Sequence, residues 1–140
     1  MKVPVVQAIL SANDQLAAQN RDIVRSKGIC VANIMASPGS AKTSLILRTL
    51  DGLAGRQRVG VVEGDIASTV DADKVAARGI PVVQINTGGQ CHLDAPMMRN
   101  ALAQLPLDQL DVVFVENVGN LICPADFKLG EDLNVVIASV

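Results

Sequence analysis

The sequence predicts an α/β fold in which helices cover both faces of a parallel β-sheet. Short apolar runs alternate along the chain with segments of helical periodicity, as expected for successive β-α-β crossovers. The runs are apolar nearly throughout, which is typical of parallel strands that are buried on both faces. The 140 residues are 49% hydrophobic and 19% charged, so the chain can form the core of one such domain.

An amphipathic helix is predicted at the start of the chain, over residues 4–26. Apolar residues recur there at helical spacing, with polar residues such as Asn13 and Asp22 between them. Lys27 and Gly28 then provide a cationic last turn and a C-capping glycine. We expect this helix to cover the sheet and to carry no chemistry of its own.

Strands and helices alternate after this first helix. The strands are expected over residues 29–35, 59–62, 81–85, 111–116 and 134–140. The helices are expected over residues 45–53, 71–78 and 93–105. We expect residues 1–28 to be a leading helix. Because a terminal apolar strand needs a helix to cover it, we expect residues 29–140 to be the N-terminal part of a longer domain.

The composition argues against several classes of function. With 12 Lys and Arg against 14 Asp and Glu, the chain lacks the dense basic surface of a nucleic-acid-binding protein. Aromatic residues make up 1% of the chain, which is too few for base stacking. No window approaches the ~20 apolar residues of a membrane span, and the first residues lack the apolar stretch of a signal peptide. We therefore expect a cytoplasmic protein with no nucleic-acid or membrane partner.

A candidate phosphate-binding loop lies between the first predicted strand and the next helix, where residues 36–43 read Ala-Ser-Pro-Gly-Ser-Ala-Lys-Thr. The P-loop pattern G-x-x-x-x-G-K-[ST] surrounds a phosphate with backbone N–H groups at this position. Lys42 is expected to reach the outer phosphates and Thr43 to bind Mg²⁺. Alanine replaces both glycines: Ala41 places a methyl group against the phosphate, and Ala36 is expected at a torsion that glycine adopts more easily. An ordinary helix start is the alternative.

Acidic residues follow two of the predicted strands, at the edge where ligands bind in open α/β sheets. Glu63-Gly64-Asp65 ends one strand, and Glu116 ends another. A carboxylate there can hold Mg²⁺ directly or through a water molecule. Single acids at strand ends are usually helix caps or solvated, but two of them beside a phosphate loop favour a nucleotide site.

Two cysteines and the single histidine form a third candidate site. Cys91-His92 and Cys123 each follow a predicted strand, so both loops can occupy one edge of the sheet, and thiolate with imidazole suits Zn²⁺ or Ni²⁺. Three ligands leave at least one tetrahedral position for water, a fourth protein ligand or a symmetry mate. Two buried cysteines with an unrelated histidine are the alternative. An odd count of three cysteines gives no disulfide framework, so we expect reduced thiols, with Cys30 in the core.

The sequence resembles the hydrogenase nickel-incorporation GTPase family HypB, in the SIMIBI class of P-loop proteins. The matching segments cover nearly the whole chain and include MASPGSAKTSL, VGVVEGDIAS, VVQINTGGQCHLDA and FVENVGNLICPADFKLGED. CHLDA and ENVGNLICPADF are the most specific, and the related urease chaperone UreG has a Cys-Pro-His motif instead. The resemblance implies a three-layer parallel-sheet P-loop NTPase fold that is incomplete at the C-terminus.

The resemblance also implies a GTPase that binds GTP with Mg²⁺ and hydrolyses GTP slowly. The implied nucleotide-binding residues are Gly39, Ser40, Ala41, Lys42, Thr43 and Ser44. Thr43 and Asp65 are the implied Mg²⁺ ligands, and Asp65 and Glu116 are the implied catalytic acids, placed around Mg²⁺ and the attacking water.

A nickel-delivery role follows from the same resemblance. Cys91, His92 and Cys123 map onto a family site that binds Ni²⁺ or Zn²⁺ at a nucleotide-linked homodimer interface. The implied partners are a HypA-type nickel metallochaperone and the large subunit of [NiFe] hydrogenase.

The sequence departs from the family pattern in its phosphate loop, which reads ASPGSAKT instead of GSPGSGKT. The 140 residues also contain no guanine-reading Asn-Lys-x-Asp motif, no N-terminal cysteine cluster and no His-rich tract. One hypothesis is a GTP-gated nickel metallochaperone. Another is a metal-binding module whose nucleotide hydrolysis is impaired by Ala36 and Ala41. A kinase or ATPase of another P-loop family is a weaker third, because the Cys-His and Cys pair counts against it.

Overall fold

The computed structural model describes residues 4–36, 42–64 and 70–138. Within these ranges, parallel strands form one sheet in the order β3-β2-β4-β1-β5. The strands are β1 (Cys30–Ala36), β2 (Val59–Glu63), β3 (Val82–Gln84), β4 (Val112–Glu116) and β5 (Leu133–Ile137). The helices are α1 (Pro4–Ser26), α2 (Lys42–Leu53), α3 (Val70–Ala76), α4 (Ala95–Gln104) and α5 (Cys123–Asp126), with a 3₁₀ turn η1 (Leu107–Gln109) before β4.

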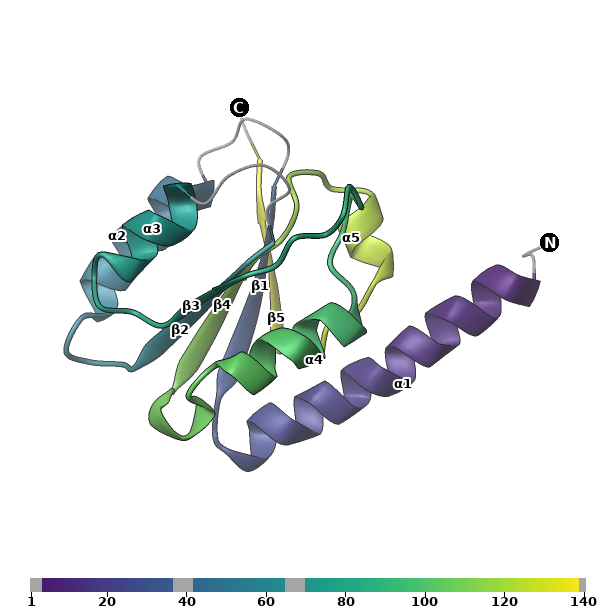
Figure 1. The fold of residues 1–140 in the computed structure, drawn as a ribbon, viewed down its shortest axis with the longest axis horizontal. Coiled ribbons are helices and arrows are strands. Elements are labelled where there is room, and N and C mark those ends of the chain that lie inside the picture. Colours follow the sequence, from purple (N-terminus) through teal and green to yellow (C-terminus); the bar gives the residue numbers. More distant parts are fainter. Residues whose placement is uncertain (1–3, 37–41, 65–69, 139–140) are drawn as a thin grey trace.

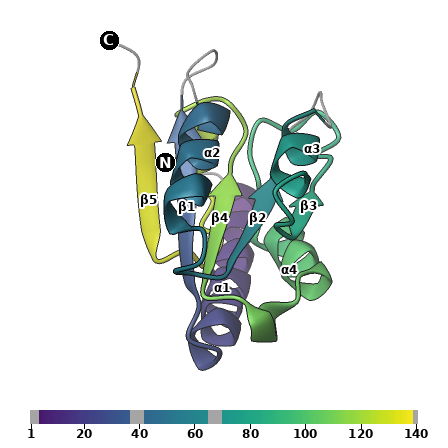
Figure 2. The same cartoon turned by 90° about the vertical axis from the view of Figure 1, so that its left-hand side faces the viewer.

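The sheet lies between two helical layers, so the predicted α/β class is confirmed (Figures 1 and 2). α2 and α3 cover one face of the sheet, and α1 and α4 cover the other. Side chains alternate along each strand: Val61 packs in the core under α2 and α3, whereas Val62 packs in the core under α1 and α4. None of the helices within the described ranges is long and apolar enough to cross a membrane.

The predicted helices and strands are present, with ends that differ by a few residues. α4 begins at Ala95 because the Asp94 side chain caps it, accepting the Met97 N–H at 2.9 Å, and Pro96 occupies its first turn. The sequence did not predict η1 and α5, because each is too short to show a helical period. The last two residues of the predicted strand over 134–140 lie outside the described residues.

Two buried asparagines fix α1 to the rest of the fold. Asn13 accepts the Ala95 N–H at 2.8 Å and donates to the Lys128 carbonyl at 2.8 Å. Asn20 donates to the carbonyls of Ala95 and Leu129, each at 3.0 Å. α1 therefore holds both the start of α4 and the segment between α5 and β5. These two segments flank the loops that carry the predicted metal ligands.

Candidate functional site

The predicted metal ligands lie on two loops at the carboxyl edge of the sheet. Cys91 and His92 lie between β3 and α4, and Cys123 begins α5 after β4. Because β2 separates β3 from β4, the first loop must cross the end of β2 to reach the second. Gly64 permits this crossing: a Cβ atom there would lie 2.7 Å from Cδ1 of the fully buried Leu93.

The structure joins Cys91 to Cys123 in a disulfide, with their Cα atoms 6.0 Å apart. The prediction of reduced thiols is therefore wrong for these two residues, although the structure does bring their loops together. Neither cysteine fits the alternative of a buried apolar pair, since Cys91 is exposed and Cys123 is half-buried. Cys30 is a free thiol, but it is exposed at the first position of β1, so its predicted place in the core is also wrong.

His92 lies beside this disulfide. Its Nδ1 atom is 3.9 Å from Cys91 Sγ, and its ring stacks on Phe127 with the ring centroids 3.8 Å apart and the planes 8° apart. The stacking fixes the plane of the imidazole next to the sulfur pair. In this oxidised form, no three His, Cys, Asp or Glu side chains are grouped as metal ligands within residues 4–36, 42–64 and 70–138.

Two asparagine side chains connect the cysteine-bearing loops. Asn117 accepts the Leu93 N–H at 3.2 Å, and Asn120 donates to the Cys91 carbonyl. Asn120 also accepts the Cys123 N–H at 2.9 Å. Neither residue was predicted from the sequence, where the available signal was two asparagines three positions apart after a predicted strand, which is a common turn pattern.

The predicted catalytic acid Glu116 ends β4 at the same edge. It pairs in register with Glu63 of β2, and both residues are buried, with 6% and 1% of their surface exposed. Alternation along the two strands places both carboxylates on the face covered by α2 and α3. This geometry puts two acids side by side where the sequence predicts the nucleotide.

The other predicted nucleotide-site residues are only partly described. Gly39, Ser40, Ala41 and Asp65 lie outside the described residues, as do the side chains of Lys42 and Thr43. Lys42 begins α2, and Ser44 is exposed in its first turn.

Ala36 does not occupy the torsion that the sequence analysis expected. It ends β1 in extended backbone, paired with Ile137, and no non-glycine residue within the described ranges has a positive φ. Its side chain is fully buried. That expectation is therefore wrong, because an extended backbone suits alanine as well as glycine.

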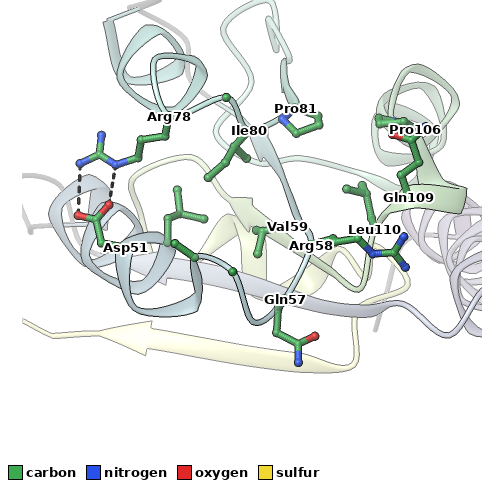
Figure 3. Close-up of a pocket in the computed structure, with 14 residues that line it drawn as sticks. Asp51, Gln57, Arg58, Val59, Arg78, Ile80, Pro81, Pro106, Gln109 and Leu110 are labelled. Carbon is green, nitrogen blue, oxygen red and sulfur yellow. Dashed lines mark hydrogen bonds and ion pairs between the residues drawn. The ribbon is translucent and has the colours of Figure 1, made fainter.

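A cavity of about 700 Å³ lies at the opposite edge of the sheet (Figure 3). Val59 at the start of β2 and Pro81 just before β3 line it. Arg78 and Asp51 form an ion pair at one side of the cavity, with Arg78 Nε 3.0 Å from Asp51 Oδ1. This cavity is separate from the loops that carry the cysteines.

Comparisons with known proteins identify the family. The family profile described as "CobW/HypB/UreG, nucleotide-binding domain" matches residues 30–137. The chain belongs to the CobW/HypB/UreG family. Similar proteins in this CobW/HypB/UreG family are named hydrogenase maturation factor HypB, which confirms the resemblance that the motifs indicated.

The curated relatives match nearly all of this CobW/HypB/UreG chain. The Azotobacter vinelandii protein is 48% identical over 136 residues, covering 97% of this chain and 45% of the relative. The Escherichia coli K12 protein is 45% identical over 132 residues, covering 94% of this chain and 46% of the relative. This chain therefore spans about half the length of these relatives.

Solved structures of HypB share the fold. HypB from Archaeoglobus fulgidus is 42% identical with a TM-score of 0.83, covering 91% of this chain and 62% of that one. HypB from Helicobacter pylori, solved in complex with nickel, is 38% identical with a TM-score of 0.83, covering 89% and 59%. The P-loop GTPase fold predicted for the CobW/HypB/UreG chain is thereby confirmed.

Proposed function

We propose that the chain is the nucleotide- and nickel-handling part of a GTP-dependent metallochaperone for [NiFe] hydrogenase maturation. The observation that supports this most strongly is the meeting of Cys91 and Cys123 beside His92, at the ligand-binding edge of the sheet. The relatives' names and the nickel complex of one of them agree with it. In this proposal residues 1–28 are a leading helix, residues 29–140 are the N-terminal part of the GTPase domain, and the protein is cytoplasmic.

The reduced Cys91 and Cys123 thiolates and the His92 imidazole hold one Ni²⁺ or Zn²⁺ ion as cargo in this proposal. With metal–sulfur bonds of about 2.3 Å, two thiolates on a tetrahedral ion lie about 3.8 Å apart. Cα atoms 6.0 Å apart allow that separation after a small opening of the loops. The disulfide and metal-bound forms exclude one another, because both require the same two sulfurs. Water or a second copy of the chain in a homodimer supplies the fourth ligand.

GTP binds through the P-loop in this proposal. Backbone and side chains of residues 39–44 surround its phosphates, with Lys42 reaching the outer ones. Mg²⁺, held by Thr43 and Asp65, supplies charge stabilisation for phosphoryl transfer when bound. Asp65 and Glu116 orient the attacking water.

Coupling between nucleotide and metal follows a short path. Asn117, directly after the catalytic acid Glu116, accepts the Leu93 N–H at 3.2 Å. Leu93 is the neighbour of His92, so a shift at the end of β4 moves the metal-binding loop. We propose that GTP changes metal affinity by this route, before transfer between a HypA-type metallochaperone and the hydrogenase large subunit.

A metal-binding module with impaired hydrolysis is the second candidate. Ala41 favours it, because the P-loop pattern has glycine there. Ala36 does not favour it, since its extended backbone needs no glycine. GTP hydrolysis by the wild type and by Ala41→Gly separates the candidates: comparable rates support the first, and hydrolysis by Ala41→Gly alone supports the second.

Titration of Ni²⁺ into the anaerobically reduced chain, with and without GTP and Mg²⁺, tests the metal site. We expect binding by wild type and by Cys30→Ala, and loss of binding in Cys123→Ala and in the oxidised wild type. Equal affinities for Cys123→Ala and wild type would contradict the metal assignment. Equal affinities with and without nucleotide would remove the coupling.

A further inference from the structure

The two cysteine-bearing loops need a connection that the sheet does not provide. Cys91 follows β3 and Cys123 follows β4, and β2 lies between these strands. Hydrogen bonds of the strand ladder therefore do not set the distance between the loops. The side chain of Asn120 spans this gap.

Asn120 binds both cysteine residues through their backbone atoms. Its Nδ2 group donates to the Cys91 carbonyl. Its Oδ1 atom accepts the N–H groups of Ile122, at 3.2 Å, and Cys123, at 2.9 Å. One side chain thus holds the loop after β3 and starts the turn that leads into α5.

The orientation of the Asn120 amide follows from the groups around it. The Cys91 carbonyl can only accept, and the Ile122 and Cys123 N–H groups can only donate. A flipped amide would face oxygen with oxygen and N–H with N–H, so the observed orientation is the one that forms all three hydrogen bonds. The carboxamide is therefore matched to this position by both its donor and its acceptor.

We propose that Asn120 is a positioning residue that sets the separation of the Cys91 and Cys123 sulfurs. This inference rests on the proposed metal-binding function for its consequence, which is high affinity for a thiophilic divalent ion. Because Asn120 binds backbone atoms rather than sulfur, its hydrogen bonds do not depend on sulfur chemistry, and in the reduced chain they already hold the loops at the separation that the disulfide and the metal require. It touches neither the metal nor the nucleotide in this assignment.

Asn120 differs in this respect from Asn117, which is buried and holds Leu93 in the core. Asn120 is partly exposed, so its replacement removes the loop connection without opening a cavity. Each of its hydrogen bonds contributes a net amount equivalent to a few-fold change in an equilibrium constant. Loss of all three is expected to lower the effective concentration of the two thiols about tenfold.

Two variants separate the connection from the turn. Asn120→Ala removes all three hydrogen bonds. Asn120→Ser keeps a short acceptor that can cap the Cys123 N–H, but a hydroxyl is too short to reach the Cys91 carbonyl. Asn100→Ala, which changes an exposed asparagine of α4, is the matched control. All variants carry Cys30→Ser, so only two thiols titrate.

The first measurement is the disulfide equilibrium in a glutathione redox buffer. Cys91 and Cys123 lose two electrons and two protons as their S–S bond forms, and one glutathione disulfide is cleaved to two glutathione thiols. We expect Asn120→Ala to lower this equilibrium constant about tenfold relative to Asn100→Ala, and Asn120→Ser, which loses the bond to the Cys91 carbonyl, to lower it a few-fold. Wild-type behaviour of Asn120→Ser would show that Asn120 only forms the turn, and would overturn the proposal.

The second measurement is Ni²⁺ affinity of the reduced variants, followed by thiolate-to-nickel charge-transfer absorption, with thermal unfolding as the check on folding. We expect weaker binding by both Asn120 variants while each still unfolds in one cooperative transition, with a midpoint at most slightly below that of Asn100→Ala. Wild-type Ni²⁺ affinity in Asn120→Ala overturns the inference and leaves the metal function standing. If the wild type binds no Ni²⁺, the proposed function fails, while the glutathione experiment still decides whether Asn120 positions the sulfurs.

Discussion

The absence of a side chain at Gly64 leaves room for the loop that carries Cys91 and His92. The fully buried Leu93 occupies the space that a Cβ atom would fill, at 2.7 Å, and its N–H binds Asn117. Leu93 is the neighbour of His92, so packing at the end of β2 is transmitted to a proposed metal ligand. Gly64 therefore acts by leaving space for Leu93, and Leu93 in turn fixes the position of the loop that carries His92.

Gly64→Ala is expected to lower the free energy of unfolding by about 1–3 kcal/mol, because the added methyl group overpacks against Leu93. It should also weaken Ni²⁺ binding by displacing His92. Gly52→Ala is the matched control: no atom lies within 4 Å of its Cβ position, and alanine stabilises a helix such as α2 by up to about 1 kcal/mol. Urea unfolding checks both variants, and a wild-type value for Gly64→Ala would refute the packing argument.

Thiol labelling checks the disulfide directly. Without reductant, one thiol per chain should react with a maleimide, at Cys30; after reduction, all three cysteines should react. Although Cys30 is exposed, partial desolvation by its neighbours, with a smaller contribution from Asp132, raises the pKa of its thiol. Because a raised pKa lowers the thiolate fraction at neutral pH, Cys30 should react more slowly than a free cysteine, and its rate should still rise above pH 9. Mass spectrometry counts the labels; three labels without reductant would contradict the disulfide.

The residue-scale geometry was predictable only where a general rule applied. The rule that ligands gather at the carboxyl ends of parallel strands placed Cys91, Cys123 and Glu116 at one edge. Sequence spacing does not report oxidation state, so the disulfide was missed. Asn120 was also missed, because the Cys91 carbonyl that it binds across the two loops lies 29 residues away in the chain.

At the scale of elements, α1 is attached through a tight contact with the segment before β5. Gly130 has φ +101°, and a Cβ atom there would lie 2.7 Å from the Ala17 carbonyl oxygen and 2.9 Å from the Arg21 nitrogen. Both neighbours are helix backbone, which cannot move as a flexible side chain can. Element boundaries followed from periodicity to within a few residues, although the cap at Asp94 was not predicted. The contact of Gly130 could not be predicted either, since no pattern relates residue 130 to residue 17.

Gly130→Ala is expected to destabilise the fold by at least about 2 kcal/mol, since the methyl group meets both an unfavourable torsion and the backbone of α1. Gly28→Ala isolates the torsion: φ is +70° there, but nothing lies within 4 Å of the Cβ position. It should cost only about 1 kcal/mol. Chemical denaturation compares the two. Equal losses would show that the contact between Gly130 and α1 contributes nothing.

At the scale of the whole molecule, the two edges of the sheet differ in chemistry. The carboxyl edge carries the cysteines, the histidine and two buried acids. The amino edge carries arginine–aspartate pairs around the large cavity, with Arg78 bound to Asp51 and Arg58 bound to Asp111. The sequence predicted the first edge from strand ends. It did not predict the second, because those pairs join residues 27 and 53 positions apart.

These pairs predict how stability depends on pH. Hydrogen bonds from Arg58 hold the pKa of Asp111 below its ordinary value, and Arg78 does the same for Asp51. A carboxyl whose pKa is lower in the folded chain than in the unfolded chain stabilises the fold at pH values above the unfolded pKa of about 3.9. This contribution is lost as pH falls through the lower folded value.

Asp111→Asn tests this dependence, because it removes the charge and keeps an acceptor. Its unfolding midpoint in urea should lie below that of wild type at pH 7 and at pH 5 by the same amount, and the difference should vanish towards pH 2. Because the pair is exposed, high salt should shrink the difference at pH 7. A difference that grows on acidification would show that the Arg58–Asp111 pair does not stabilise the fold.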